Sequence, residues 1–305
     1  MLGDISTKQE WQKCRGRLLP QESLSGYTSW RVGGPASYVY IPADLADTVS
    51  FLQRLPPEMM LLWLGLGSNT LVRDGGVDAV AIITQGALAS ITLEDSVVVR
   101  AEAGVSCAQI ARYTARNGLM GLEFMAGIPG TVGGALAMNA GCYGGETWQR
   151  VCQVETINRE GVLKIRPASD FTASYRHVVC PENEWFVAGY FKLTPGDKKQ
   201  ALDNIRVLLE KRNAAQPTSW PNGGSVFRNP KDNFAAKLIE QSGLKGFKLG
   251  GASVSEKHAN FIINEGEASA ADIEKLIEHV ADVVEQNHKI RLIPEVRIVG
   301  KSLPG

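Results

Sequence analysis

The chain has 305 residues, of which 44% are hydrophobic and 21% are charged, as in ordinary soluble globular proteins. Lys plus Arg and Asp plus Glu each number 32, so the formal net charge of zero favours neither nucleic acid nor an anionic membrane surface as partner. This length predicts about two domains. No apolar run approaches the roughly 20 residues that span a bilayer.

Cysteine and histidine usage argues against a metal site. The five cysteines are an odd number and include no Cys-x-x-Cys pair, so we expect neither a disulfide framework nor a bound metal. This cysteine usage fits a protein of the reducing cytoplasm best. The polar residues 1–10 lack the apolar core of a signal peptide. The four histidines show no ligand spacing, and we expect His279 and His288 on the polar surface of a late helix.

The first half of the chain predicts many strands and few helices. A helical face of Leu45, Val49 and Leu52 lies between two apolar strand candidates, which makes a βαβ unit. Ser106 is positioned to cap a helix that stops at Asn117-Gly118. The remaining expected elements are a short helix at 4–14, a connector at 21–26, and strands at 38–41, 61–64, 80–83, 97–101, 151–157, 162–165 and 185–193.

The βαβ unit leads into Gly65-Leu-Gly67, which resembles the start of a dinucleotide fingerprint. However, Thr70 replaces the third glycine. No long helix follows, because Arg73-Asp-Gly-Gly76 interrupts the pattern before another strand. A Rossmann fold needs both features, so we exclude it.

The second half carries more helical pattern. Amphipathic spacing predicts a helix that ends at Lys211-Arg212, cations that suit either a helix C-terminus or a ligand. Ser269 and Asp272 can cap a long helix. A further helix is expected at 234–239, closed by Gly243, and strands are expected at 259–263 and 296–299. The whole chain is therefore expected to be α+β, with an N-terminal segment (1–27), a first domain (28–197) and a smaller domain (198–305).

Glycines crowd residues 127–145 without the charged or low-complexity runs of a flexible linker. Glycine is favoured where the backbone takes positive φ or approaches another group closely. Bare amides suit the oxygens of a diphosphate, because no side chain stands between them. The alternative interpretation is a tight structural corner between two elements.

Three further stretches carry candidate chemistry. Arg176, in a segment with few other charges, could grip a carboxylate with two parallel hydrogen bonds, or form a surface ion pair. Ser225 follows two glycines and could donate a proton, or be a simple turn residue; Phe227 rules out the Gly-x-Ser-x-Gly nucleophile elbow. Glu295 precedes an apolar strand, where many carboxylates simply face solvent.

Taken together, these stretches resemble the UDP-N-acetylenolpyruvoylglucosamine reductase family over nearly the whole chain. The matching motifs are 28–34, 64–71, 127–145, 171–176, 224–230, 257–261 and 294–297. The resemblance implies an FAD-binding domain of the vanillyl-alcohol-oxidase (PCMH) type and a smaller α+β substrate-binding domain. The short run from Tyr175 to Trp185 leaves little room for the family's inserted substrate loop, so the chain is similar to the loop-less subclass.

The resemblance also implies which residues bind ligands. The implied contacts to non-covalent FAD are Arg31, Gly65, Gly67, Ser68, Asn69, Thr70, Leu71, Gly127, Ile128, Pro129, Gly130, Thr131, Gly133, Gly134, Asn139 and Gly141. The implied substrate contacts are Tyr175, Asn229, Lys257 and His258. No metal is implied.

The implied reaction is the NADPH-dependent reduction of an enolpyruvyl sugar nucleotide to UDP-N-acetylmuramate, in peptidoglycan precursor synthesis. The resemblance implies that Arg176 stabilises the substrate carboxylate, that Glu295 hydrogen-bonds this carboxylate or orients Arg176, and that Ser225 donates the proton. We expect a cytoplasmic monomer. Two alternatives are an FAD-dependent alcohol or sugar oxidase of the same fold, and a non-catalytic nucleotide-binding protein.

Overall fold

A computed structural model describes residues 14–303 of the chain. Its described residues form two compact units, each assembled from separate stretches of the chain. Unit 1 comprises residues up to 20, 38–65 and 79–209, and unit 2 comprises 21–37, 66–78 and 210 onwards. The linear domain boundaries at 28 and 198 stay a prediction, and the helix expected at 4–14 lies outside the described residues. Within the described part, no helix combines the length and apolar character needed to cross a bilayer.

The smaller sheet of unit 1 confirms the predicted βαβ unit. The strand order is β1 (Arg17–Ser23), β2 (Pro35–Ile41), β5 (Val77–Ile83) and β3 (Met60–Leu64), with α2 (Leu45–Leu52) between β2 and β3 in the chain. Strands β3 and β5 are parallel, so a crossover connects them. Tyr40 stacks on Phe51 with ring centroids 3.6 Å apart, and this pair anchors α2 in a buried apolar cluster.

The connector expected at 21–26 is wrong. Residues 21–23 continue β1, and η1 (Leu24–Tyr27) is a short 3-10 helix whose Leu24 is fully buried. Ser23 accepts a hydrogen bond from the Ser25 amide and caps this turn. Because β1 is an edge strand, its polar side chains gave no apolar alternation to detect.

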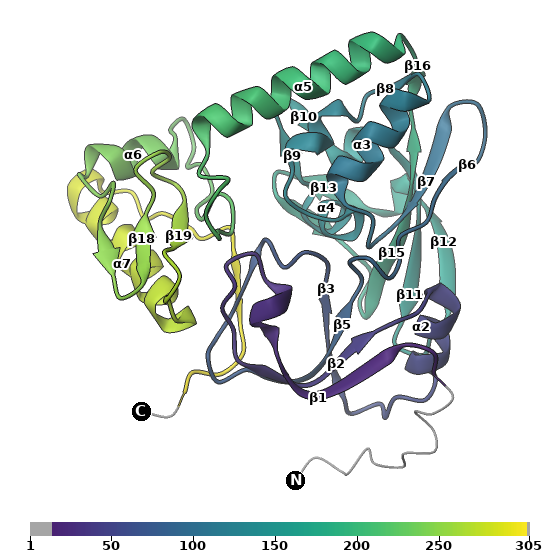
Figure 1. Cartoon of the computed structure of the whole chain (residues 1–305), viewed down its shortest axis with the longest axis horizontal. Coiled ribbons are helices and arrows are strands. Elements are labelled where there is room, and N and C mark those ends of the chain that lie inside the picture. Colours follow the sequence, from purple (N-terminus) through teal and green to yellow (C-terminus); the bar gives the residue numbers. More distant parts are fainter. Residues whose placement is uncertain (1–13, 304–305) are drawn as a thin grey trace. The chain divides into compact units, whose positions relative to one another are not determined.

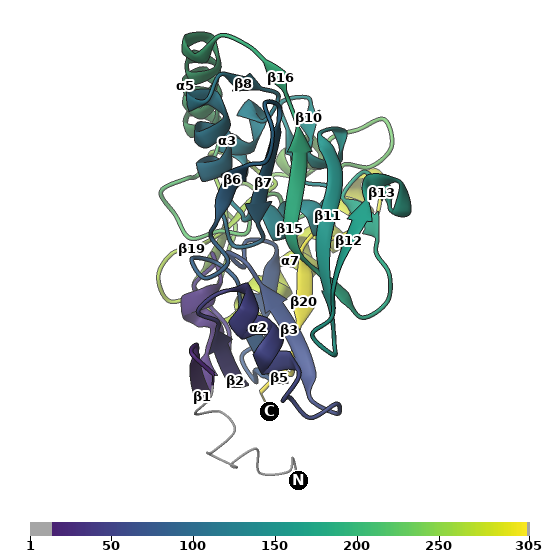
Figure 2. The ribbon, with the colours of Figure 1, turned by 90° about the vertical axis from the view of Figure 1, so that its right-hand side faces the viewer.

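The larger sheet of unit 1 is five-stranded and antiparallel, and Figure 2 displays its strand order. From edge to edge it contains β12 (Leu163–Pro167), β11 (Val151–Asn158), β15 (Glu184–Lys192), β7 (Val98–Glu102) and β6 (Ile91–Leu93). Helices α3 (Cys107–Arg116) and α4 (Val132–Met138) contribute to the same apolar core as these strands. The predicted strands of this region are thus confirmed within a few residues, while β6 was missed.

Helix α3 begins and ends where the sequence predicts. Ser106 and Gln109 form a reciprocal capping box at its N-terminus. Asn117 is the C-cap residue, and Gly118 takes a φ of 68°, the left-handed conformation that glycine tolerates best.

Unit 2 packs helices on a small sheet, and Figure 1 shows α7 beside β18 and β19. Its elements are β4 (Thr70–Val72), α6 (Ala235–Gln241), β17 (Lys248–Leu249), β18 (Ala252–Val254), β19 (Ile262–Asn264), α7 (Ala270–His288) and β20 (Arg297–Val299). Strands β17, β18 and β19 form one sheet, and β20 pairs with β4 in parallel. The capping box of Ser269 and Asp272 confirms the predicted start of α7.

Several details of the second half differ from expectation. Helix α5 (Lys198–Ala215) extends past Arg212, because the next residues keep helical hydrogen bonds up to Gln216. Phe234 is the N-cap of α6 and is 65% exposed rather than part of its apolar face. His279 and His288 are half-buried rather than surface residues, and the His279 ring stacks on Phe247 with centroids 4.5 Å apart.

Candidate active site

Arg176 lies at the tip of a short hairpin in unit 1 that the sequence pattern did not reveal. Strands β13 (Thr172–Ser174) and β14 (His177–Val179) pair so that Tyr175 and Arg176 form a two-residue turn. Arg176 has a φ of 55°, an unfavourable left-handed conformation for a non-glycine residue. Its side chain is half-buried, and Nη2 donates a hydrogen bond to the Gly141 carbonyl over 2.9 Å.

Tyr175, predicted to contact substrate, sits beside this arginine. The Tyr175 side chain is 49% exposed, and the guanidinium carbon of Arg176 lies 5.4 Å from its ring centroid. This distance allows a cation–π contact, which limits the motion of both side chains. The two side chains therefore lie side by side at the turn, and the roles of both toward a ligand stay predictions.

Two glycine-rich segments meet within unit 1. A Cβ built on Gly65 would lie 2.1 Å from Thr131 Oγ1, so only glycine fits beside this threonine. Thr131 is 1% exposed, and its hydroxyl has no hydrogen-bond partner among the described residues. The amides of Gly65, Thr131 and Gly134 likewise donate no hydrogen bond within residues 14–303. Of these three residues only Thr131 is buried, whereas Gly65 is half-buried and Gly134 is exposed. Donors without protein partners fit a diphosphate, whose oxygens accept such bonds.

The second glycine segment is also held firmly by its surroundings. The Val132 amide donates to the Val105 carbonyl over 2.8 Å, and the Cys107 amide donates to Gly130 over 2.9 Å. A Cβ on Gly133 would lie 2.8 Å from that of Ala103, so this glycine allows close packing of α4. The segment is therefore both a tight structural corner, as the alternative interpretation held, and a rigid set of amides.

Asn139 ends α4 in a left-handed conformation with a φ of 41°. It is 2% exposed, and its Nδ2 donates to Ser174 O and to Glu146 Oε2, both over 3.1 Å. Its Oδ1 accepts from the Trp148 amide, also over 3.1 Å. Asn139 thus joins α4 to the hairpin that carries Arg176; its implied contact with a cofactor stays a prediction.

Ser225 and Glu295, 70 positions apart, come together in unit 2. The Glu295 amide donates to the carbonyl of Val226 over 2.7 Å, and Phe227 forms an isolated antiparallel bridge with Pro294. Ser225 and Glu295 are both half-buried. Arg176 belongs to unit 1, whereas these two residues belong to unit 2.

Asn260 supports the backbone beside Ser225, and the sequence reasoning did not single it out. It is 4% exposed, and its side chain both accepts from the Phe227 amide over 2.9 Å and donates to the Phe227 carbonyl over 2.8 Å. Its own carbonyl accepts from the Val226 amide over 2.9 Å. Asn260 therefore holds the segment that follows Ser225. Its place in the motif 257–261 could have pointed to it, but within that motif only Lys257 and His258 were predicted to bind substrate.

The remaining predicted residues of unit 2 make specific protein contacts. Asn229 is exposed and its Oδ1 accepts from the Ala235 amide over 3.1 Å, which caps α6. Lys257 is exposed and donates to the Asn213 carbonyl. Arg31 is exposed, has a φ of 59°, and closes a turn in which its amide donates to the Thr28 carbonyl. Their roles toward ligands stay predictions.

His258 is half-buried against unit 2. Its Nδ1 accepts from the Asn260 amide over 3.3 Å, and its ring meets Phe261 edge-on. Burial lowers the pKa of His258 below its usual value, because desolvation penalises the imidazolium. His258 is therefore suited to a neutral hydrogen-bonding role. Among the residues that the structure describes, no group of three or more His, Cys, Asp or Glu side chains could hold a metal ion.

Comparison with known proteins matches both halves of the chain. The family model "UDP-N-acetylenolpyruvoylglucosamine reductase, C-terminal domain" matches residues 216–299, and the model "FAD binding domain" matches residues 36–165. UDP-N-acetylenolpyruvoylglucosamine reductase of Alkalilimnicola ehrlichii is 55% identical over 287 residues, covering 94% of this chain and 96% of that protein. The same enzyme of Methylococcus capsulatus is 54% identical over 288 residues, covering 94% and 95%.

A solved structure is similar over the same extent. The UDP-N-acetylenolpyruvylglucosamine reductase of Thermus caldophilus superposes with a TM-score of 0.81 at 30% sequence identity. The superposition covers 94% of this chain and 99% of the other. The α+β class and the combination of an FAD-binding domain with a smaller C-terminal domain are thus confirmed.

Proposed function

The chain belongs to the UDP-N-acetylenolpyruvoylglucosamine reductase family, and on that premise we propose that Arg176, Ser225 and Glu295 carry its chemistry. It is an FAD-containing, NADPH-dependent oxidoreductase that makes UDP-N-acetylmuramate, a peptidoglycan precursor. The observation that carries the assignment of residues is the 2.7 Å hydrogen bond from the Glu295 amide to Val226, next to Ser225.

The residues of unit 1 fit the diphosphate of FAD. Gly65 leaves space beside the buried Thr131 hydroxyl, and the amides of both residues lack other partners in the described chain. When bound, FAD would supply the chemistry of hydride transfer between NADPH and the enolpyruvyl substrate. We assign Gly65, Thr131 and Gly134 to the diphosphate, because converging amides can bind its oxygens without intervening side chains.

Arg176 is assigned to the substrate carboxylate. Hydride addition to a vinyl carbon places negative charge on the adjacent carbon and its carboxylate. A guanidinium stays ionised and can bind a carboxylate through two parallel hydrogen bonds, so it stabilises this charge. The anchoring of Nη2 on the Gly141 carbonyl leaves the guanidinium partly pre-oriented, which lowers the cost of reorganisation during the reaction.

Ser225 is assigned as the proton donor to the carbon beside the carboxylate. A free serine is a very weak acid, so this step needs strongly polar surroundings. Glu295 lies two residues before Arg297, and its backbone amide is hydrogen-bonded to the carbonyl of Val226, the residue after Ser225. We assign Glu295 to a hydrogen bond with the substrate carboxylate or to the orientation of Arg176.

Separate measurement of the two half-reactions tests this assignment. Under anaerobic stopped-flow conditions we expect Ser225→Ala to be reduced by NADPH at the wild-type rate. Its reoxidation by the enolpyruvyl sugar nucleotide should fall about 10²–10⁴-fold, the usual effect of losing a general acid. Ser302→Ala, an exposed serine of unit 2, is the control. Equal slowing of both half-reactions would remove Ser225 from the role of proton donor.

We also propose that the protein is a cytoplasmic monomer of the loop-less subclass. Free cysteines throughout the described chain are consistent with a reducing compartment. Only β14 and a brief connection separate Tyr175 from Trp185, which supports the absence of an inserted loop. Sedimentation that reports a single chain over a hundredfold concentration range tests the oligomeric state; a dimer would contradict it.

A further inference from the structure

We propose that Asn139 is a positioning residue that fixes the Arg176 hairpin, and that it does not act as a direct ligand of FAD. This inference rests on the proposed role of Arg176. All the residues involved lie in unit 1.

The first step concerns the turn that needs support. Arg176 adopts a φ of 55° in a two-residue turn between strands of three residues each. Such a conformation is unfavourable for an arginine, and hairpins this short are marginal by themselves. The conformation therefore depends on contacts made outside the hairpin.

Two contacts tie this turn to the segment that follows α4. On one side, Asn139 Nδ2 donates to the carbonyl of Ser174, the residue that precedes the turn. On the other, Arg176 Nη2 donates to the carbonyl of Gly141, two residues after Asn139. The backbone and the guanidinium of the turn are thus both held by residues 139–141.

The amide of Asn139 is itself fully oriented by protein groups. Both of its donor hydrogens are engaged, one by Ser174 O and the other by Glu146 Oε2, while Oδ1 accepts from the Trp148 amide. The residue is 2% exposed. No donor remains for a cofactor oxygen, so the side chain is better suited to hold the hairpin than to bind FAD directly.

Helix α4 links this arrangement to the glycine segment. Thr131, with its buried unpartnered hydroxyl, is the N-cap of α4, and Asn139 is the C-cap of the same helix. The seven-residue helix α4 therefore connects the segment assigned to the diphosphate with the residues that hold the guanidinium assigned to the substrate carboxylate. Asparagine is well suited to its position, because it tolerates the left-handed conformation better than most residues.

The main variant is Asn139→Gly, which keeps the left-handed backbone and removes all three side-chain hydrogen bonds. We expect FAD affinity and the rate of flavin reduction by NADPH to stay within about twofold of wild type. Reoxidation by the enolpyruvyl substrate should slow about 10²-fold, the order expected when a reacting group is misplaced by roughly 1 Å. Asn139→Asp, which loses both donors but keeps the acceptor, should behave alike and serves if the glycine variant folds poorly.

The matched control is Asn183→Gly. Asn183 also has positive φ, at 56°, but is exposed and has no side-chain hydrogen bond in the described chain. This substitution should leave both half-reactions unchanged. If it slows reoxidation as much as Asn139→Gly, the effect is general loosening of unit 1 and the proposal is overturned.

A double-mutant cycle measures whether the effect of Asn139 on the reoxidation rate passes through Arg176, which a purely structural role of Asn139 would not predict. In an Arg176→Ala background, Asn139→Gly should add less than about a threefold further loss in reoxidation, because its effect passes through Arg176. Additive losses, or weakened FAD binding in Asn139→Gly, would overturn the proposal. If Arg176→Ala alone leaves reoxidation unchanged, the proposed role of Arg176 fails instead, so the two failures are distinguishable.

Discussion

The side-chain amide of Asn69 donates a hydrogen bond to the backbone carbonyl of Glu295 over 3.2 Å. The amide of Arg297 returns the contact by donating to the Asn69 carbonyl over 2.9 Å, at the start of the parallel pair β4 and β20. One glycine-rich segment thus fixes the backbone of a proposed catalytic carboxylate, although the two residues are 226 positions apart. This coupling makes the position of Glu295 dependent on a distant loop.

Substitution of Glu295 should affect the substrate half-reaction selectively. We expect Glu295→Ala to slow flavin reoxidation about 10²–10³-fold, as for loss of one transition-state hydrogen-bond donor. Glu295→Gln should lose less, because its amide can still donate a hydrogen bond. Reduction by NADPH should be unaffected in both. Glu267→Ala, an exposed carboxylate of unit 2, is the control. A slow reductive step in Glu295→Ala would contradict this role.

Gly65→Ala should weaken FAD binding. The new methyl group would lie 2.1 Å from Thr131 Oγ1, so the two glycine segments would have to move apart. We expect the purified variant to retain well under half of the wild-type flavin, measured by absorbance after gel filtration. Gly26→Ala, with no heavy atom within 4 Å of the added carbon, should bind FAD normally.

Asn260→Ala should destabilise unit 2. The substitution leaves the buried Phe227 N–H and C=O without their partners, and each such group costs about 1–3 kcal/mol. We therefore expect a loss of about 3 kcal/mol in the free energy of unfolding, measured by urea titration of the holoenzyme. Asn287→Ala, exposed on α7, should change stability by less than about 0.5 kcal/mol. Comparable losses for both would show that the Phe227 contacts contribute little.

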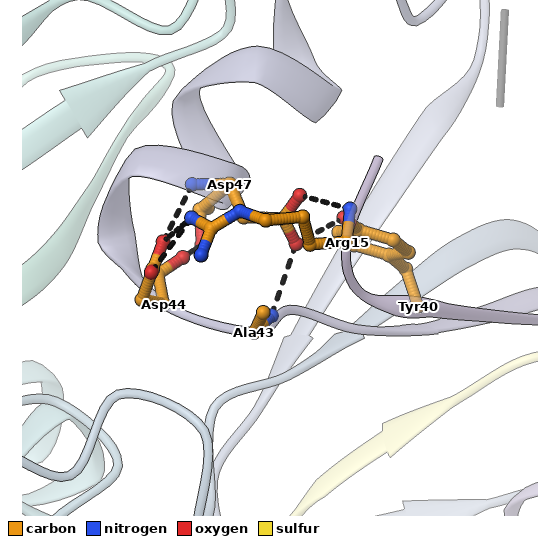
Figure 3. A network of polar contacts seen from close by, with 6 residues as sticks. Arg15, Tyr40, Ala43, Asp44 and Asp47 are labelled. Atoms are coloured by element: carbon orange, nitrogen blue, oxygen red, sulfur yellow. Dashed lines mark hydrogen bonds and ion pairs between the residues drawn. The ribbon is translucent and has the colours of Figure 1, made fainter. Parts of the chain in front are cut away.

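Figure 3 shows a polar network in unit 1 that predicts a pH-dependent stability. Asp47 is 3% exposed and accepts from the Tyr40 hydroxyl over 2.5 Å and from the amides of Arg15 and Ala43. Burial alone would raise the pKa of Asp47, but these hydrogen bonds outweigh it, and the pKa lies below its usual value. The carboxylate therefore stabilises the fold above about pH 4, its unfolded pKa, and this stability is lost as pH falls through the lower folded pKa.

Tyr40→Phe tests this network. Removing the hydroxyl should cost about 1.5–3 kcal/mol at pH 7, the range for a hydrogen bond to a charged group. The deficit relative to wild type should shrink below about pH 4, as Asp47 becomes protonated in both proteins. Tyr38→Phe, whose hydroxyl has no hydrogen bond in the described chain, should have little effect. Thermal unfolding between pH 3 and pH 8 checks the prediction, and a deficit independent of pH would contradict it.

The sequence predicted those elements whose signal is local. Helices α3 and α7 were located by their capping residues, Ser106 and Ser269, because a cap is read within one turn. The strands of the larger sheet were located by apolar runs. The hairpins β9 (Gly141–Cys142) with β10 (Gly145–Glu146), and β13 with β14, were missed, because strands of two or three residues show no periodicity.

By itself, the sequence determined the family, the cofactor and the candidate catalytic residues, since the motifs that define them are short and their residue types are specific. Only the tertiary structure placed Thr131 beside Gly65, joined Glu295 to the Ser225 segment, and assigned Asn139 and Asn260 to the support of neighbouring backbone. The physical reason is that the hydrogen-bond partners of a buried amide or hydroxyl decide what role that group has in the structure. Those partners lie far away in the chain, where no local pattern records them.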